Sequence, residues 1–199
     1  MEPQTVGHKL STYPTRMEVT QYNCKESWDW LKSYGLSDDE IDLHFFYSPE
    51  QQRHVFWNLD LDGTEFFEAR AVSTNRIPKS LQHGPKPFVV LGNHEDNQDV
   101  VVVVEDIISA IKVSRHYLTI PLFGSHLSEA SMAKIGKLGV RGCVVWLDAD
   151  KYPVGMHYAK QLSAILPTTA LQTKEDPKCL HDTDVIVEVE NAVEAMESV

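Results

Sequence analysis

Five consecutive valines, Val100 to Val104, constrain the fold of this chain more than any other feature. A strand with one solvent-exposed face alternates apolar and polar residues, whereas an unbroken β-branched run is typical of a parallel sheet that is covered on both faces. Parallel strands need long crossover connections, which are usually helices. The run therefore predicts an α/β domain built on a small parallel sheet.

The residues that follow the valines alternate between helix and strand patterns. We expect a helix over "DIISAIKVSRH", a strand over "LTIPLFG", a helix in "SEASMAKIGKLG" that Ser125 or Ser128 opens, a strand over "GCVVWLD", a helix over "GMHYAKQLSAIL" and a strand over "TTALQT". Such alternation is the pattern of successive βα units, with helices on the faces of a parallel sheet.

The preceding part of the chain has a mixed pattern. A helix is predicted from Lys25 and ends at Gly35, and Ser37 with Glu40 forms a capping box that begins a second short helix. Strands near Val55–Leu59 and Glu65–Val72 flank the turn "LDGT" and predict a β-hairpin. "RIPKSLQHGPKP" is expected to be a loop, and "FVVLG" a short buried strand. This region is therefore an α+β subdomain.

These patterns divide the chain into four segments. We predict an N-terminal arm over residues 1–24, the α+β subdomain over 25–97, the parallel α/β domain over 98–180 and an acidic C-terminal tail or helix over 181–199. The tail has apolar residues at helical spacing, which favours a solvated helix that packs on the domain. A docking helix and a mimic of nucleic-acid charge remain alternatives for it.

The charge of the chain is unevenly distributed. The net charge is -11, which would ordinarily count against a nucleic-acid partner. Residues 69–147 nevertheless hold nine Lys and Arg against six Asp and Glu, and no acid occurs from Ala69 to His94. That stretch contains Arg70, Arg76, Lys79 and Lys86. It is either ordinary loop composition or a surface that binds phosphates.

Cysteine usage and hydropathy exclude several other classes of protein. The three cysteines, Cys24, Cys143 and Cys179, lie far apart, which argues against a disulfide framework and against a zinc ribbon. The sequence has no apolar run of about 18 residues and no signal-peptide pattern at its N-terminus. We therefore expect no membrane partner and a cytoplasmic location, which is the host cytoplasm if the protein is viral.

Acidic residues stand at the ends of two predicted parallel strands. Glu105 follows the valine run, and Asp148 and Asp150 follow "VVWL". Residues two apart in a strand point to the same side, and ligands of open parallel sheets bind beyond the carboxyl ends of the strands. Three converging carboxylates would repel one another without a cation, and oxygen ligands suit Mg²⁺ or Mn²⁺. The alternative is that these acids cap adjacent helices.

The same residues resemble a known fold. "VVVVVE" followed by "PLFGSHLSEASMAKIGKLGVRGCVVWLDAD" resembles the Toprim fold, whose signature is a glutamate after the first strand and Asp-x-Asp after a later one. DNA primases, topoisomerases and some nucleases share it. "SWDWLKSYGLSDDEIDLHFFYSP", "GTEFFEARAV", "IPKSL", "GPKPFVVLGN" and "DPKCLHDTDV" are similar to the regions that flank this fold in bacterial and phage primases. The resemblance covers roughly Lys25 to Val185.

The resemblance implies a function and a set of site residues. The chain is expected to be a stand-alone, phage-type primase core that synthesises short primers on single-stranded DNA from nucleoside triphosphates, with Mg²⁺ or Mn²⁺ as cofactor. Glu105, Asp148 and Asp150 would be catalytic and would hold the metal, and Arg70, Lys79 and Lys86 would contact template, primer or triphosphate. The sequence has no zinc module and no G-x-x-x-x-G-K-[ST] loop, so a separate replicative helicase is an expected partner.

Two other functions remain open. A Toprim nuclease would use the same three acids to cleave nucleic acid, although it has no evident need for the "EARAV" and "IPKSL" segments. A catalytically degenerate accessory protein would keep the fold and bind nucleic acid or a replication protein. Asp106, where primases usually have glycine, and Ser109, where an acid is common, favour this last alternative.

Overall fold

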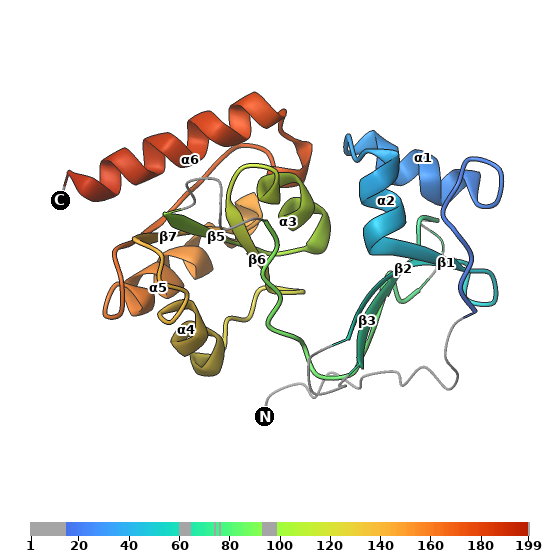
Figure 1. Ribbon diagram of the computed structural model, residues 1–199, viewed down its shortest axis with the longest axis horizontal. Coiled ribbons are helices and arrows are strands. Elements are labelled where there is room, and N and C mark those ends of the chain that lie inside the picture. Colours follow the sequence, from blue (N-terminus) through green and yellow to red (C-terminus); the bar gives the residue numbers. More distant parts are fainter. Residues whose placement is uncertain (1–14, 60–64, 74, 76, 93–98, 199) are drawn as a thin grey trace. The chain divides into compact units, whose positions relative to one another are not determined.

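The computed structural model describes residues 15–59, 65–73, 75, 77–92 and 99–198 (Figure 1). The chain forms two compact units, Met1–Pro87 and Phe88–Val199, and each is described by itself. The boundary predicted between residues 97 and 98 lies outside the described residues, as does most of the expected arm. Among the residues that the structure describes, no helix is both long enough and apolar enough to cross a membrane.

The first unit combines two helices with an antiparallel sheet. Its sheet has the strand order β1-β2-β3-β4, in which neighbours in sequence are neighbours in space. The elements are α1 (Lys25–Ser33), α2 (Asp38–His44), β1 (Phe45–Ser48), β2 (Arg53–Leu59), β3 (Glu65–Arg70) and β4 (Ser80–His83).

Two of the local structures predicted for the first unit are present, and one prediction is wrong. The capping box is confirmed, because the Ser37 hydroxyl accepts from the Glu40 backbone N–H and the Glu40 carboxylate accepts from the Ser37 backbone N–H. The β2–β3 hairpin is also confirmed. The prediction that "RIPKSLQHGPKP" is entirely loop is wrong, because β4 lies within it and pairs with β3. β4 is short and half-buried throughout, so it lacks an alternating pattern.

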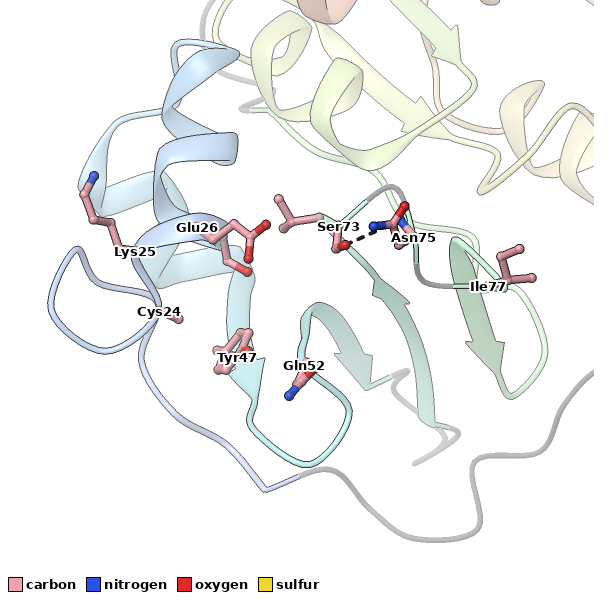
Figure 2. A pocket seen from close by; sticks show the side chains of 10 residues that line it. Cys24, Lys25, Glu26, Tyr47, Gln52, Ser73, Asn75 and Ile77 are labelled. Atoms are coloured by element: carbon pink, nitrogen blue, oxygen red, sulfur yellow. Dashed lines mark hydrogen bonds between the residues drawn. The ribbon is translucent and has the colours of Figure 1, made fainter.

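A polar pocket of about 730 Å³ lies in the first unit (Figure 2). Its lining comes from the start of α1, strand β1, the β1–β2 turn and the segment after β3, and includes Lys25, Glu26, Tyr47, Gln52 and Ser73. None of the predicted basic site residues lines it. The pocket therefore does not correspond to the site that the sequence predicts.

The second unit is the predicted parallel α/β domain. Its elements are β5 (Val100–Val104), α3 (Ile107–Ser114), β6 (Leu118–Pro121), α4 (Glu129–Ile135), β7 (Gly142–Trp146), the 3₁₀ helix η1 (Ala149–Lys151), α5 (Tyr152–Leu162), β8 (Thr168–Ala170), the 3₁₀ helix η2 (Pro177–Cys179) and α6 (Asp182–Glu197). The fold-class prediction, a small parallel sheet preceded by an α+β subdomain, is confirmed.

Boundary details differ from the sequence expectations. The prediction of a strand in "FVVLG" is wrong, because only Leu91 forms an isolated bridge, to Thr119 of β6. Ser128, and not Ser125, caps α4. Helix α5 begins at Tyr152, before the expected Gly155, with a proline in its first turn where no backbone N–H is needed.

The order of the parallel strands locates the place where such sheets bind ligands. The sheet order is β6-β5-β7-β8, so the chain moves from β5 to one neighbour and then crosses to the other. β5 is thus central, which explains why all five valines are buried. The direction of winding reverses between β5 and β7, and ligands of open α/β sheets bind at the carboxyl edge beside such a reversal.

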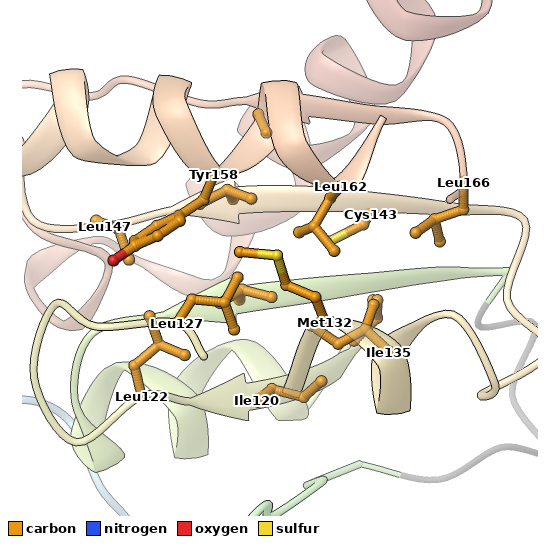
Figure 3. Packing of buried hydrophobic residues seen from close by; sticks show 14 of the residues in the cluster. Ile120, Leu122, Leu127, Met132, Ile135, Cys143, Leu147, Tyr158, Leu162 and Leu166 are labelled. Atoms are coloured by element: carbon orange, nitrogen blue, oxygen red, sulfur yellow. The ribbon is translucent and has the colours of Figure 1, made fainter. Parts of the chain in front are cut away.

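A continuous apolar core fixes these strands. Alternate residues of β5 and β7 pack with α4 and α5, and Figure 3 shows Cys143, Met132, Ile135, Tyr158 and Leu162 in this layer. Helix α6 contacts β7, β8 and α3, away from α4 and α5 (Figure 1). Its buried Val185, Val189 and Ala192 confirm that the acidic tail is a helix packed on the domain. The strand ends are therefore held rigidly.

Candidate active site

Glu105 and Asp148 follow the two strands that flank the reversal of winding. Val104 pairs with Trp146, so β5 and β7 end level with each other, one residue before Glu105 and two before Asp148. The Glu105 carbonyl accepts from the Gly124 N–H at 3.0 Å. Beside it, Phe123 is buried with a φ of 50°, a region that non-glycine residues rarely adopt and that is often found at functional sites.

Asp150 does not have the strand geometry expected from the sequence. β7 ends at Trp146, and Asp150 lies in η1, so the argument that Asp148 and Asp150 point to the same side of a strand is wrong. The Asp150 side chain is 71% exposed and forms an ion pair with Lys151. Asp150 still contributes to the charge around Glu105, but it lies at the rim.

Lys178 brings three aspartates together at this edge of the sheet. Its ammonium Nζ lies 2.7 Å from Asp106 Oδ2, 3.0 Å from Asp148 Oδ2 and 3.0 Å from Asp176 Oδ2. The Lys178 side chain is only 10% exposed. These carboxylates raise the pKa of Lys178 well above its ordinary value, against the opposing effect of burial. Lys178 is therefore permanently charged.

The main chain around Lys178 is anchored to helix α3. Lys112, which is buried on α3, donates from Nζ to the Lys178 carbonyl at 3.0 Å and also to the Leu180 carbonyl. Asp106 caps the start of the same helix by accepting from the Ser109 N–H at 2.9 Å. Helix α3 and η2 thus contact each other through two buried lysines.

Two carboxylate oxygens in this region lack a partner. Glu105 Oε2 and Asp148 Oδ1 are both buried, and neither receives a hydrogen bond. Burial and the neighbouring charge of Asp148 raise the pKa of Glu105, and burial also raises the pKa of Asp148 despite its contact with Lys178. A buried carboxylate oxygen without a partner is costly unless a cation or donor reaches it. This pair is therefore suited to bind a cation.

The donor atoms fit a hard divalent cation. Among the described residues, no group of three or more His, Cys, Asp or Glu side chains is arranged to hold a metal ion. Mg²⁺ does not require such a cage, because it keeps several waters and binds through one or two carboxylates together with substrate phosphates. The two unpartnered oxygens of Glu105 and Asp148 match that mode of binding.

Arg70 lies in an aromatic stack of the first unit. Its guanidinium is 5.3 Å from the Trp30 ring centroid, and Trp30 stacks on His54 at 4.7 Å. His54 is Arg70's neighbour across the β2–β3 pair, and burial together with the charge of Arg70 lowers the pKa of His54 to about 3. Arg70 Nε is buried without a hydrogen-bond partner. Arg70 is therefore held in place beside a neutral histidine.

Lys79 and Lys86 expose their side chains on the same unit. The Lys79 carbonyl accepts from Arg53 Nη1 at 2.9 Å and from the Ala71 N–H at 2.9 Å, so its backbone is fixed while its side chain faces solvent. Arg53 is 3% exposed and also donates to the Pro78 carbonyl. The three predicted basic residues belong to the first unit and the acids to the second.

Sequence reasoning missed part of the acidic cluster. The sequence pattern predicts no site role for Asp106, Asp176 or Lys178. Glu105 directly follows β5, whereas β8 ends at Ala170 and Asp176 lies in the loop that leads to η2, so the rule that parallel strands end at one edge does not identify Asp176. The contact of Lys178 with three acids has no sequence signal either, because it depends on the path of the same loop.

Comparison with known proteins supports the fold. The sequence matches no family model and no curated protein. The structure is similar to the crystal structure of the Aquifex aeolicus primase, zinc-binding and RNA polymerase domains, with a TM-score of 0.64 and 15% sequence identity. The match covers 88% of this chain and 57% of that one. At this identity the likeness establishes a primase-like fold.

Proposed function

We propose that this chain is a phage-type primase core that joins nucleotides into short primers on single-stranded DNA. The observation that carries the proposal is a pair of buried, unpartnered carboxylate oxygens on Glu105 and Asp148, beside the winding reversal of a primase-like sheet. Nucleoside triphosphates are the proposed substrates, and a separate replicative helicase is a proposed partner. Nucleotidyl transfer depends mainly on positioning and on neutralising phosphate charge.

The acids of the second unit would have distinct roles. Glu105 and Asp148 would hold Mg²⁺ or Mn²⁺, which when bound neutralises phosphate charge and activates the attacking hydroxyl. Glu105 would also assist removal of the 3′-hydroxyl proton, because a carboxylate can accept a proton from a hydroxyl within hydrogen-bond reach. Asp150, at the exposed rim, would orient the incoming triphosphate through that same ion.

The basic residues of the first unit would bind the nucleic acid or the triphosphate. Lys79 presents an exposed ammonium from an anchored backbone, and Arg70 presents a guanidinium held against Trp30. Lys86 would add a third phosphate contact. Such contacts position the nucleic acid without reading its sequence.

A primer-synthesis assay tests this proposal. The protein is incubated with single-stranded DNA, ribo- or deoxyribonucleoside triphosphates and Mg²⁺ or Mn²⁺. We expect short oligonucleotides from the wild type and a loss of at least ~100-fold with Glu105→Gln, since removing one charged group at a phosphoryl-transfer site has effects of that order. Glu194→Gln, an equivalent change at an exposed position of α6, should have no effect.

The same assay separates the two alternatives. Metal-dependent degradation of single-stranded DNA in the absence of triphosphates would identify a nuclease. No product at any metal concentration, with Glu105→Gln indistinguishable from wild type, would contradict catalysis and favour an accessory protein.

A further inference from the structure

The cation at the centre of the aspartate cluster is part of the chain itself. An ammonium group has three N–H donors, and Lys178 makes three contacts of 2.7 to 3.0 Å with Asp106, Asp148 and Asp176. The contacts with Asp106 and Asp148 are charge-assisted hydrogen bonds, and the contact with Asp176 is an ion pair. The charge of Lys178 is therefore already paired with three carboxylates and is not available to a substrate phosphate.

Lys178 is also held in this position by its surroundings. Lys112 binds the Lys178 and Leu180 carbonyls, and Pro177, which precedes Lys178, is buried. Exposed lysines, by contrast, have long flexible side chains that sample many positions. Lys178 would have to leave three carboxylates in a partly buried cluster in order to move, so it is a fixed component of the edge.

The remaining carboxylate oxygens of the three aspartates and of the neighbouring Glu105 show which atoms are still available to bind a cation. Asp106 Oδ1 accepts from the Ser109 N–H at 2.9 Å, and Asp176 Oδ1 accepts from the Ala149 N–H at 3.3 Å. Asp148 Oδ1 and Glu105 Oε2 are the buried carboxylate oxygens of this cluster without a hydrogen bond. One cation bound by these two oxygens would give both of them a partner.

We propose that Lys178 is a built-in cation that occupies one cation position of the cluster, so that the site binds one divalent ion where the same acids alone would bind two. The inference rests on the proposed function for the identity of that ion, Mg²⁺ or Mn²⁺. Lys178 is a positioning residue in this proposal, because it acts by fixing Asp106, Asp148 and Asp176 and does not contact the substrate.

Counting bound Mn²⁺ tests the proposal directly. Free Mn²⁺ is measured by electron paramagnetic resonance during titration of the full chain. We expect one Mn²⁺ per wild-type chain, and two for Lys178→Met, which keeps much of the side-chain volume and frees three carboxylates. Lys174→Met is the matched control, since it removes an exposed lysine from the same loop with the same change in charge and should bind one.

Thermal unfolding provides a second measurement in case Lys178→Met folds poorly. Without metal, Lys178→Met should melt at a lower temperature than wild type, and Mn²⁺ should raise its melting temperature more than that of wild type. If Lys178 only stabilised the fold, Lys178→Met would have a lower melting temperature that Mn²⁺ does not restore. Lys178→Arg should still bind one Mn²⁺, because it retains the positive charge, although its larger planar guanidinium does not reproduce the ammonium's contacts.

The outcomes separate this proposal from the proposed function. Equal Mn²⁺ counts in Lys178→Met and wild type, or a wild-type count of zero or two, would overturn the inference. Counts of one and two without primer synthesis would support the role of Lys178 and reject the polymerase function. Primer synthesis with equal counts would reject only the role of Lys178.

Discussion

One set of charged residues from each unit shows how differently ion pairs are exposed in this protein. In the first unit, Lys25 and Asp29 form an ion pair whose side chains are 71% and 49% exposed, and Lys79 points to solvent. In the second unit, Lys178 is 10% exposed and contacts three carboxylates. Strand direction helps to explain why acids gather in the second unit. Parallel strands all end at one edge and gather the residues that follow them, whereas successive antiparallel strands end at opposite edges.

The largest stability effect should come from the buried cluster. Removing one partner of a buried ion pair leaves uncompensated charge, so Lys178→Met should lower the free energy of unfolding in metal-free buffer by ~3–5 kcal/mol. Lys25→Met removes the exposed pair and should cost less than ~1 kcal/mol. Urea unfolding measures both, and equal losses would show that the two units do not differ in this way.

A smaller effect is expected at the anchor of the first unit. Arg53 donates charged hydrogen bonds to the Pro78 and Lys79 carbonyls, and such bonds contribute about 1.5–3 kcal/mol. Arg53→Met should lose stability in that range and should also weaken binding of single-stranded DNA, because the backbone that carries Lys79 loosens. Unchanged DNA affinity in a destabilised variant would remove Lys79 from the proposed binding surface.

Salt dependence measures the exposed cations directly. Each phosphate contact to single-stranded nucleic acid contributes about 0.7 to the slope of log affinity against log salt concentration. Lys79→Ala and Lys86→Ala should each reduce the slope by about that amount. Lys160→Ala, which removes an exposed lysine from α5, is the control and should leave the slope unchanged. The same reduction in all three variants would indicate a nonspecific charge effect.

The pH dependence of stability should differ in sign within the cluster. The folded-state pKa of Glu105 is raised, first by burial and then by Asp148, so the folded state holds extra protons and stability falls as pH rises above about 4.5. Burial raises the pKa of Asp176, but the contact with Lys178 lowers it by more, so the net pKa is lowered. The stabilisation that ionised Asp176 contributes to the folded state is therefore lost as the pH falls.

Two variants test these signs in metal-free buffer. The free energy of unfolding of Glu105→Gln, relative to wild type, should increase as the pH rises. Asp176→Asn should be less stable than wild type at neutral pH, and this difference should shrink as the pH falls through the acidic range. Measuring the free energy of unfolding against pH provides the comparison. Parallel profiles for the two variants would contradict the opposite environments assigned to these carboxylates.

Much of the second unit follows from local patterns. The uniform valines of β5 predict a central parallel strand, and the residues after it predict the βα order, because burial on both faces leaves a clear signal. β4 could not be recognised, since its pairing with β3 is a tertiary contact and its residues are all half-buried. The predicted strand geometry of Asp150 was wrong for a related reason. The 3₁₀ helix η1 begins at Ala149, so the strand does not extend to Asp150.

The position of a manganese ion in crystals grown with Mn²⁺ tests the central claim most directly. We predict one anomalous peak within coordination distance of Glu105 Oε2 and Asp148 Oδ1, with Lys178 still in contact with its three aspartates. A peak among Asp106, Asp148 and Asp176 with Lys178 displaced, or no peak at this edge of the sheet, would contradict the claim.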